Sequence, residues 1–140
     1  MSMIKIFCDG GARGNPGPAA YGFVVYLDDK LIKKGAGYIG IATNNFAEYT
    51  ALIAALKWLA SQFRGHDLEF NLDSQLVASQ LSGTYKIKNA KIREFVVEIR
   101  ALETNFGQIR YLHIRRELNR EADSLVNQVL DEQNLENSKH

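Results

Sequence analysis

The chain has 140 residues, of which 46% are hydrophobic and 24% are charged, and its formal net charge is +1. This length and composition predict one folded domain and exclude a disordered protein, while the small net charge argues neither for nor against a nucleic-acid partner. A single cysteine excludes an internal disulfide, and no apolar run suggests a signal peptide or a membrane span. We therefore expect a cytoplasmic protein without membrane contact. We also expect a monomer without an obligate protein partner.

The first 40 residues have the alternating pattern of β-strands. This pattern predicts a strand over residues 3–9 and two further strands over residues 20–28 and 31–40, the last two joined by a tight turn. Because the glycine-rich loop expected over residues 10–19 is short, the first strand pairs antiparallel with the second. Three antiparallel strands therefore open the chain.

After these strands, helical patterns alternate with single strands. A strand that follows a helical crossover lies parallel to its neighbour, so the last two strands run parallel to the first. The order βββαβααβα predicts an α/β domain over residues 1–131, with a mixed five-stranded sheet flanked by helices, and a polar C-terminal tail over residues 132–140 that frays. The remaining predicted elements are helices over residues 44–63, 74–81, 90–106 and 121–130 and strands over residues 67–73 and 108–115.

The stretch FCDGGARGNPGP at residues 7–18 sets a carboxylate beside four of the eleven glycines and both prolines. Asp9 ends the first predicted strand, and open α/β sheets bind their ligands at the carboxyl ends of strands. Glycines at such a place let a bulky ligand approach the backbone, although a tight hairpin turn explains them nearly as well. No GK[ST] sequence follows, which excludes a nucleotide-binding P-loop.

Four carboxylates occupy positions where a purely structural role is unusual. Asp9 and Asp73 end two strands that we expect to be parallel neighbours, which brings like charges to one edge of the sheet. Glu48 and Asp123 each lie in the apolar stripe of a helix, whereas an acid that only favours the helix dipole usually lies on the wet face. The four together favour a shared site over coincidence.

Carboxylate oxygens are ligands for hard cations such as Mg²⁺. Zinc is excluded because the three histidines have no ligand spacing and Cys8 stands alone. Cys8 points away from Asp9, so we interpret it as a small buried hydrophobe. Two Mg²⁺ ions about 4 Å apart in a carboxylate cluster are the arrangement for phosphoryl transfer by in-line attack.

Four motifs are spread over nearly the whole chain. They are DGGARGNPGPAAYG at residues 9–22, TNNFAEYTAL at residues 43–52, LDSQLV at residues 72–77 and RELNREADSLVN at residues 116–127. With its carboxylates in the order Asp, Glu, Asp, Asp, the chain resembles the type 1 ribonuclease H family. The resemblance implies the ribonuclease H-like fold, whose mixed sheet has the strand order 3-2-1-4-5 with strand 2 antiparallel.

The resemblance implies an endonuclease that hydrolyses the RNA strand of RNA/DNA hybrids and leaves 5′-phosphate and 3′-hydroxyl ends. It implies two Mg²⁺ ions as cofactors, for which Mn²⁺ substitutes. Asp9 would bridge the two ions, and Asp123 would help to hold the one that activates water. Glu48 and Asp73 would hold the ion at the leaving 3′-oxygen.

The resemblance also implies which residues contact the hybrid. An A-like duplex displays its 2′-hydroxyls in a wide minor groove, which suits polar side chains and close backbone approach. The asparagines among these residues also fit turn and helix-cap chemistry, so both roles stay open. The implied contacts are Asn15, Asn44, Asn45 and Gln75 in the minor groove, Thr43 on a DNA phosphate, the amides of Gly10 and Gly11 at RNA 2′-hydroxyls, and Asn119.

The chain departs from the best-known bacterial form of the family in two places. That form has a catalytic-loop histidine, for which Arg116 stands here, as in a short-loop branch; arginine cannot relay a proton at neutral pH but can hold a phosphate. His113 falls within the last predicted strand, where we interpret it as structural. The basic handle helix is missing, and Lys86, Lys88 and Lys91 partly replace its charge, so weaker hybrid binding is expected.

Three alternatives stay open at this point. A non-catalytic nucleic-acid-binding module on the same fold would be favoured by the loss of a carboxylate, but none is lost. A 3′–5′ exonuclease or transposase-like core shares the first aspartate but not the GNPGP loop or the NN-x-x-E helix start. The phosphate-binding domain of a sugar kinase would need a second lobe, for which 140 residues leave no room.

Overall fold

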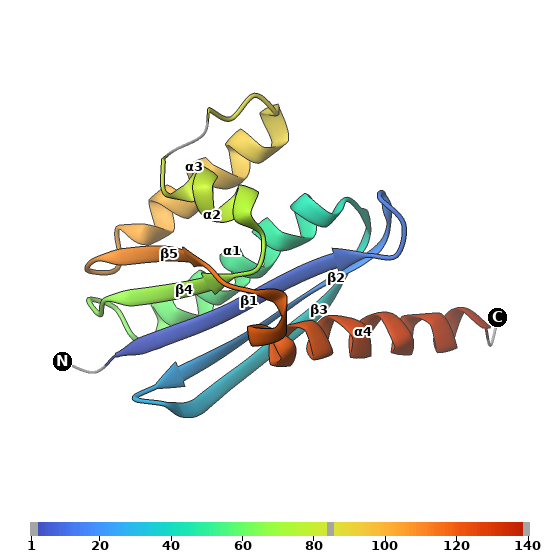
Figure 1. Ribbon diagram of the computed structural model, residues 1–140, viewed down its shortest axis with the longest axis horizontal. Coiled ribbons are helices and arrows are strands. Elements are labelled where there is room, and N and C mark those ends of the chain that lie inside the picture. The colour runs from blue at the N-terminus through green and yellow to red at the C-terminus, as the bar shows by residue number, and fades with distance from the viewer. Residues whose placement is uncertain (1–2, 84–85, 139–140) are drawn as a thin grey trace.

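The computed structural model describes residues 3–83 and 86–138 and contains one five-stranded sheet with helices on both faces (Figure 1). Its elements in chain order are β1 (Ile4–Ala12), β2 (Gly17–Leu27), β3 (Lys30–Ala42), α1 (Asn44–Gln62), β4 (Leu68–Leu72), α2 (Gln75–Leu81), α3 (Ala90–Glu103), β5 (Ile109–His113), the 3₁₀ turn η1 (Arg116–Leu118) and α4 (Arg120–Ser138). The strand order is β3-β2-β1-β4-β5, with β2 antiparallel to both neighbours. The predicted α/β fold and sheet order are confirmed.

The helices form two layers. α1, α2 and α3 cover one face of the sheet, and α4 crosses the other face over β2, β1 and β3 (Figure 1). The larger core lies between the sheet and α1, and it buries Ile4, Ile6 and Cys8 completely. A smaller core lies under α4, where Ala20 packs with Leu130. Cys8 is therefore the buried hydrophobe that its position predicts.

Helix α1 begins where its sequence pattern predicts. Thr43 Oγ1 accepts a hydrogen bond from the backbone nitrogen of Phe46 at 3.1 Å, which satisfies one of the free amides of the first turn. Gly65 follows the helix with a φ of +86°, a conformation that favours glycine. Trp58 packs on Phe63 with ring centroids 5.8 Å apart, in agreement with its predicted packing role.

β1 and β2 continue through the glycine-rich stretch, so the prediction of a loop over residues 10–19 is wrong. Ala12 pairs with Ala19, and only residues 13–16 connect the two strands. Ala19 and Ala20 are fully buried. The small residues here let other elements pack closely on the paired strands, which a local pattern of glycines does not distinguish from a loop.

The sheet brings the two strand-end aspartates together. The parallel pairing of β1 with β4 ends at Cys8 and Leu72. Asp9 is the next residue of β1 and Asp73 directly follows β4, so both emerge at the carboxyl edge of this parallel pair. Their predicted placement is confirmed.

The predicted helix end at residue 130 is wrong, because α4 continues through the predicted polar tail as far as Ser138; residues 139–140 of that tail lie outside the described part of the chain. The helix extends past the sheet (Figure 1). Arg13 Nη2 lies 2.6 Å from Asp131 Oδ1, and this ion pair fastens the helix to the β1–β2 turn. None of the described helices has both the length and the apolar character needed to cross a bilayer.

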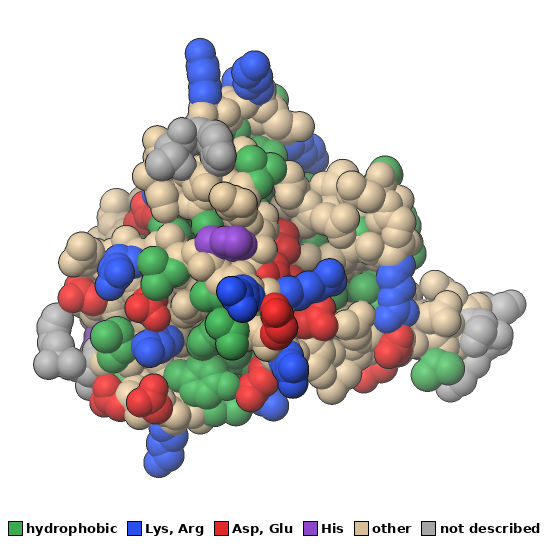
Figure 2. All heavy atoms as spheres, viewed as in Figure 1, with side chains coloured by type: hydrophobic (Ala, Val, Ile, Leu, Met, Phe, Trp, Pro, Cys, Tyr) green, Lys and Arg blue, Asp and Glu red, His purple; other side chains and the backbone are tan. Residues whose placement is uncertain are grey.

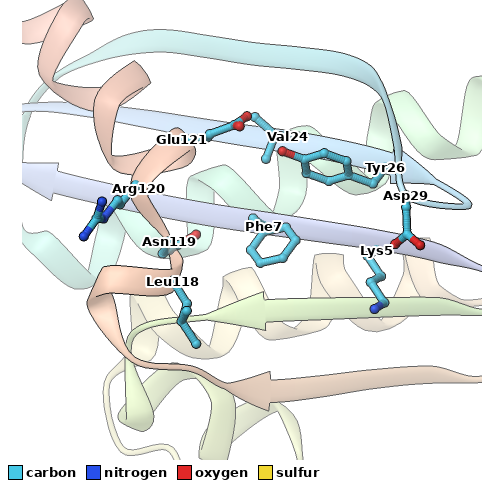
Figure 3. A pocket seen from close by; sticks show the side chains of 9 residues that line it. All are labelled: Lys5, Phe7, Val24, Tyr26, Asp29, Leu118, Asn119, Arg120 and Glu121. Atoms are coloured by element: carbon cyan, nitrogen blue, oxygen red, sulfur yellow. The ribbon is translucent and has the colours of Figure 1, made fainter.

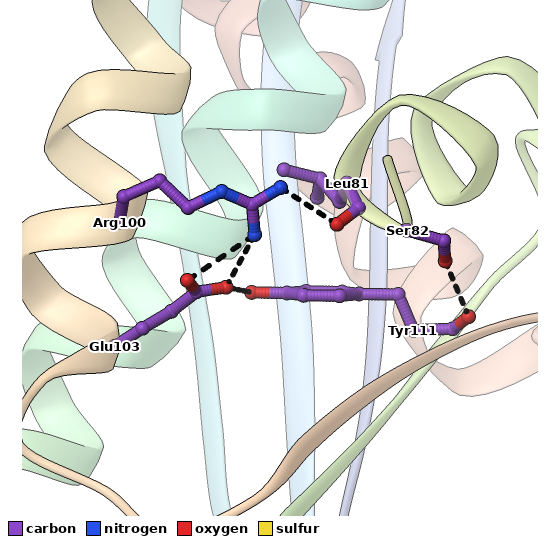
Figure 4. A network of polar contacts seen from close by, with 5 residues as sticks. All are labelled: Leu81, Ser82, Arg100, Glu103 and Tyr111. Atoms are coloured by element: carbon purple, nitrogen blue, oxygen red, sulfur yellow. Dashed lines mark hydrogen bonds and ion pairs between the residues drawn. The ribbon is translucent and has the colours of Figure 1, made fainter. Parts of the chain in front are cut away.

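A polar network fastens α2 and α3 to the edge strand β5 (Figure 4). Arg100 donates to Glu103 Oε2 at 2.9 Å and to the carbonyl oxygen of Leu81 at 2.7 Å. The Tyr111 hydroxyl donates to Glu103 at 2.7 Å, and burial raises the pKa of Tyr111 above its ordinary value. Ser82 donates to the carbonyl oxygen of Tyr111 at 3.4 Å. These contacts hold α3 against the sheet.

The connection between α2 and α3 carries positive charge. Its described residues, 82–83 and 86–89, contain no helix, as expected for a chain without the handle. Lys86, Lys88 and Lys91 are exposed, and Lys and Arg side chains project from this end of the molecule (Figure 2).

Candidate active site

Gly10 lets helix α1 approach the sheet at the level of the expected site. A Cβ atom at this position would lie 2.2 Å from the backbone carbonyl carbon of Ala47 and 2.4 Å from the backbone nitrogen of Glu48. Only glycine allows such a close approach of two backbones. The first turn of α1 therefore lies directly against β1, and the Glu48 carboxylate lies beside that of Asp9.

Gly22 has the same function for helix α4 on the other face of the sheet. It is the register partner of Asp9 on β2, and a Cβ atom there would lie 2.8 Å from the carbonyl oxygen of Ala122 and 2.9 Å from the Cβ of Leu125. The first turns of α4 therefore lie directly on β2, and the Asp123 carboxylate is close enough to Asp9 for its charge to raise the Asp9 pKa. Gly10 and Gly22, on paired strands, thus let one helix approach each face of the sheet at the level of Asp9.

The four predicted carboxylates converge at the carboxyl edge of β1 and β4. One oxygen each from Asp9, Glu48 and Asp73 lies within 4.8 Å of the other two, and Asp123 completes the group through Asp9. Asp9 is 7% exposed and Glu48 is 8% exposed. Burial, together with the charges of Asp73 and Asp123, raises the pKa of Asp9 to about 8. Burial and then the charges of Asp9 and Asp73 raise the pKa of Glu48 well above its ordinary value.

This cluster fits a hard divalent cation. Glu48 Oε2 is buried and has no hydrogen-bond partner among the described residues, an arrangement that destabilises the folded state. The donors are all carboxylate oxygens, the ligands that Mg²⁺ and Mn²⁺ prefer. A bound cation would pair with the orphaned oxygen and offset the repulsion between the acids.

The raised pKa of Asp9 predicts how the stability of the metal-free protein depends on pH. The unfolded chain loses this proton near the ordinary value of 3.8, whereas the folded protein keeps it up to about 8. The folded protein therefore binds more protons between these values, so the free energy of unfolding falls as the pH rises through this window. We expect the Tm in EDTA to fall from about pH 5 to about pH 9, and Mg²⁺ to restore it at alkaline pH. A Tm in EDTA that stays level or rises over this range would contradict the raised pKa.

The carboxylates line an open pocket of about 420 Å³. Most of the residues predicted for the site meet on its wall, although they come from β1, α1, η1, α4 and the end of β4. Arg116 is exposed in η1, so its guanidinium group is available to an anionic ligand of this pocket. The predicted residues on the wall are Asp9, Gly10, Gly11, Asn44, Asn45, Glu48, Asp73, Arg116 and Asp123.

Two of the predicted minor-groove asparagines also hold the structure together. Asn15 Oδ1 accepts a hydrogen bond from the backbone nitrogen of Asn44 at 3.0 Å, and Asn44 Oδ1 accepts one from the backbone nitrogen of Ala12 at 2.8 Å. These bonds fasten the β1–β2 turn to the start of α1. Both residues are exposed, and both bonds use the carbonyl oxygen, which leaves the amide nitrogen for another partner.

Thr43 lies at a second pocket, of about 350 Å³, between the N-termini of α1 and α3. Asn89 Oδ1 caps α3 by accepting from the backbone nitrogen of Ile92 at 3.1 Å, and Lys91 Nζ lies 5.6 Å from the centre of the Phe46 ring. Two helix N-termini and a lysine suit an anion. Asn89 was not among the predicted site residues, although an asparagine before a helical pattern is an N-cap signal.

Gln75 and Asn119 lie outside the carboxylate pocket. Gln75 is exposed in the first turn of α2, whereas Asn119 is 1% exposed and faces the interior. Asn127 was not predicted either; its Nδ2 donates a hydrogen bond to Asp123 Oδ2 at 3.4 Å. Residues four positions apart share a helix face, and this spacing was the signal that could have found Asn127.

Known proteins are similar to this chain in sequence and in fold. A family model described as reverse transcriptase-like matches residues 7–129. A ribonuclease HI of Halobacterium salinarum is 43% identical over 130 residues, which are 92% of this chain and 65% of that protein. The chain belongs to the type 1 ribonuclease H family.

Solved structures of ribonucleases H superpose closely on the chain. The crystal structure of RNase H1 from Halobacterium salinarum has a TM-score of 0.88 and 42% identity, covering 93% of this chain and 98% of that chain. LC11-RNase H1 in complex with an RNA/DNA hybrid has a TM-score of 0.89 and 38% identity, with the same coverage. A bifunctional protein of Mycobacterium tuberculosis is 40% identical over 91% of this chain, which spans 35% of that protein. The chain thus spans less than two thirds of these curated relatives.

Compared with the ribonuclease H form that carries a catalytic-loop histidine, this chain presents an arginine. His113 ends β5 and is exposed, which confirms its placement in the strand. The pocket wall, as far as the described residues form it, contains Arg116 and no histidine.

Proposed function

We propose that this chain is an endoribonuclease that hydrolyses the RNA strand of RNA/DNA hybrids and leaves 5′-phosphate and 3′-hydroxyl ends. The observation that carries the proposal is the convergence of four carboxylates at the carboxyl edge of β1 and β4. The likeness to LC11-RNase H1, solved with a hybrid, supports this substrate. All four carboxylates come from one chain, so we infer a monomer that needs no partner to complete its site.

The carboxylates would hold the cofactor, for which we propose Mg²⁺, with Mn²⁺ as a substitute. When bound, two such ions would activate the attacking water and stabilise the charge on the leaving 3′-oxygen. Asp9 contacts both Glu48 and Asp123, so it is the carboxylate best placed to be shared between two ions. The contribution of the protein is to hold the four acids in place before the substrate arrives.

The polar residues around the carboxylates would orient the hybrid. Asn44 and Asn45 on the pocket wall would contact the wide minor groove of an A-like duplex. The pocket between the N-termini of α1 and α3, with Thr43 at its edge, would accept a phosphate of the DNA strand. The exposed Lys86 and Lys88 would attract the duplex electrostatically, so binding should weaken as salt rises.

Cleavage of labelled duplexes tests the activity directly. We expect the protein with Mg²⁺ to cut the RNA strand of an RNA/DNA hybrid and to leave DNA/DNA intact. Asp73→Asn removes one of the clustered acids and should lower kcat by roughly 10³-fold. Double-stranded RNA serves as a third substrate. A wild type that binds the hybrid without cutting it would favour the non-catalytic module. An Asp73→Asn variant that cuts as well as the wild type would show that the carboxylate cluster is not the catalytic site.

The role of Arg116 can be separated from proton transfer. Arg116→Ala should lower kcat about 10-fold through the loss of a charged hydrogen bond to phosphate. Since arginine stays protonated, the loss should be the same across neutral and alkaline pH. Arg116→Lys, which keeps the charge, should recover part of the rate. An unchanged kcat for Arg116→Ala would remove this residue from the site.

A further inference from the structure

Asn119 connects three of the four carboxylate-bearing segments from a buried position at the junction of η1 and α4. Its Nδ2 donates to the carbonyl oxygen of Cys8 at 2.8 Å and to Asp73 Oδ2 at 3.3 Å. Its backbone oxygen accepts from the backbone nitrogen of Asp123 at 3.1 Å. Cys8 directly precedes Asp9 on β1, and Figure 3 shows Asn119 at the start of α4, over this strand.

The orientation of the Asn119 amide follows from its partners. A backbone carbonyl only accepts hydrogen bonds, so the amide nitrogen must face Cys8, and its second hydrogen is then available to Asp73. Asp73 lies in a bend after the last paired residue of β4, where no strand pairing holds its backbone. The hydrogen bond from Asn119 therefore restrains the Asp73 carboxylate at a point where the sheet does not.

A neutral amide is suited to this task. A lysine or arginine here would cancel the negative charge that a cation needs, whereas an amide donates a hydrogen bond and leaves the charge in place. The Oδ1 atom of Asn119 is buried and has no hydrogen-bond partner among the described residues, which stability alone does not favour. An apolar residue would avoid that unpaired acceptor but could not hold Asp73.

We propose that Asn119 is a positioning residue that holds the Asp73 carboxylate at its spacing from Asp9 and Glu48, and that it does not contact the hybrid. The proposal rests on the proposed two-metal ribonuclease function. It replaces the expected substrate contact of Asn119, because the side chain is only 1% exposed and both amide hydrogens are already donated within the protein.

Asn71 provides a matched control for this residue. It is also a buried asparagine, 5% exposed, and its Nδ2 donates to a β1 carbonyl oxygen, that of Ile6, at 3.3 Å. It does not line the carboxylate pocket. Asn71→Ala and Asn119→Ala should therefore both lower Tm, while only Asn119→Ala should weaken Mg²⁺ and Mn²⁺ binding and lower kcat, each by about 10- to 100-fold, with little change in KM for the hybrid.

Isothermal titration with Mg²⁺ and Mn²⁺, together with hybrid kinetics well below both Tm values, measures these effects. Asn119→Asp keeps the shape but sets a carboxylate against Asp73, so it should bind metal no better than Asn119→Ala. If Asn119→Ala does not fold, Asn119→Ser is measured in its place. Metal affinity and kcat equal to those of Asn71→Ala would overturn the proposal. If the wild type cuts no hybrid, the ribonuclease proposal fails, and the metal affinities still decide whether Asn119 positions Asp73.

Discussion

Replacing Asp9 with asparagine should abolish hybrid cleavage and at the same time stabilise the metal-free protein. Asp9 lies at the centre of the carboxylate cluster, and burial with neighbouring charges raises its pKa to about 8. Above that pH the folded protein holds a buried charge among other acids, and asparagine removes this repulsion. We expect kcat to fall by roughly 10³-fold or more. In EDTA at alkaline pH, Tm should rise by about 3–8 °C, corresponding to ~1–2 kcal/mol.

The same chemical change at an exposed site is the control. Asp29 lies in the turn between β2 and β3 with a φ of +67°, which asparagine tolerates. Asp29→Asn should leave both kcat and Tm unchanged. Measurement of kcat with a labelled hybrid and of thermal unfolding in EDTA separates the two effects of Asp9→Asn. Retained cleavage would remove Asp9 from the site, and a lowered Tm at alkaline pH would contradict the repulsion among the acids.

Gly10→Ala should destabilise the protein and displace Glu48 from the site. The added Cβ would meet the backbone of Ala47 and Glu48 at 2.2 to 2.4 Å, and backbone atoms cannot move aside as a flexible side chain does. Helix α1 must therefore shift away from β1, at a cost of about 3 kcal/mol in the free energy of unfolding. We expect kcat to fall with it, because Glu48 moves away from Asp9 as the helix shifts.

Gly11→Ala is the matched stability control on the same strand. A Cβ atom at Gly11 would lie 3.7 Å from Val126 Cγ1, which is an ordinary contact. The variant should be as stable as the wild type or slightly more so, by about 0.4–1 kcal/mol, because alanine restricts the unfolded chain. Urea unfolding of both variants measures the difference. If the Gly10→Ala and Gly11→Ala variants were equally stable, the packing of α1 on β1 would not require glycine at position 10.

The sequence predicted the arrangement of elements well, because each helix and strand carries its own apolar period. It also located the four acids, since a carboxylate at a strand end or in an apolar stripe is visible locally. The glycine-rich stretch was misinterpreted as a loop over residues 10–19, and the helix over residues 120–138 was predicted to end at residue 130. In the first place a contact with a distant segment decides the structure, because α1 packs on Gly10; in the second, α4 continues beyond its last apolar positions.

The sequence by itself therefore determined the fold class, the family and the identity of the acids, all of which depend on local patterns and motifs. Only the tertiary structure decided what surrounds those acids. Gly10 and Gly22 admit a helix on each face of the sheet, and Asn119 reaches the carbonyl oxygen of Cys8, 111 residues away in the sequence. Such contacts depend on how closely two elements pack, and the apolar pattern within one element does not predict its distance from another.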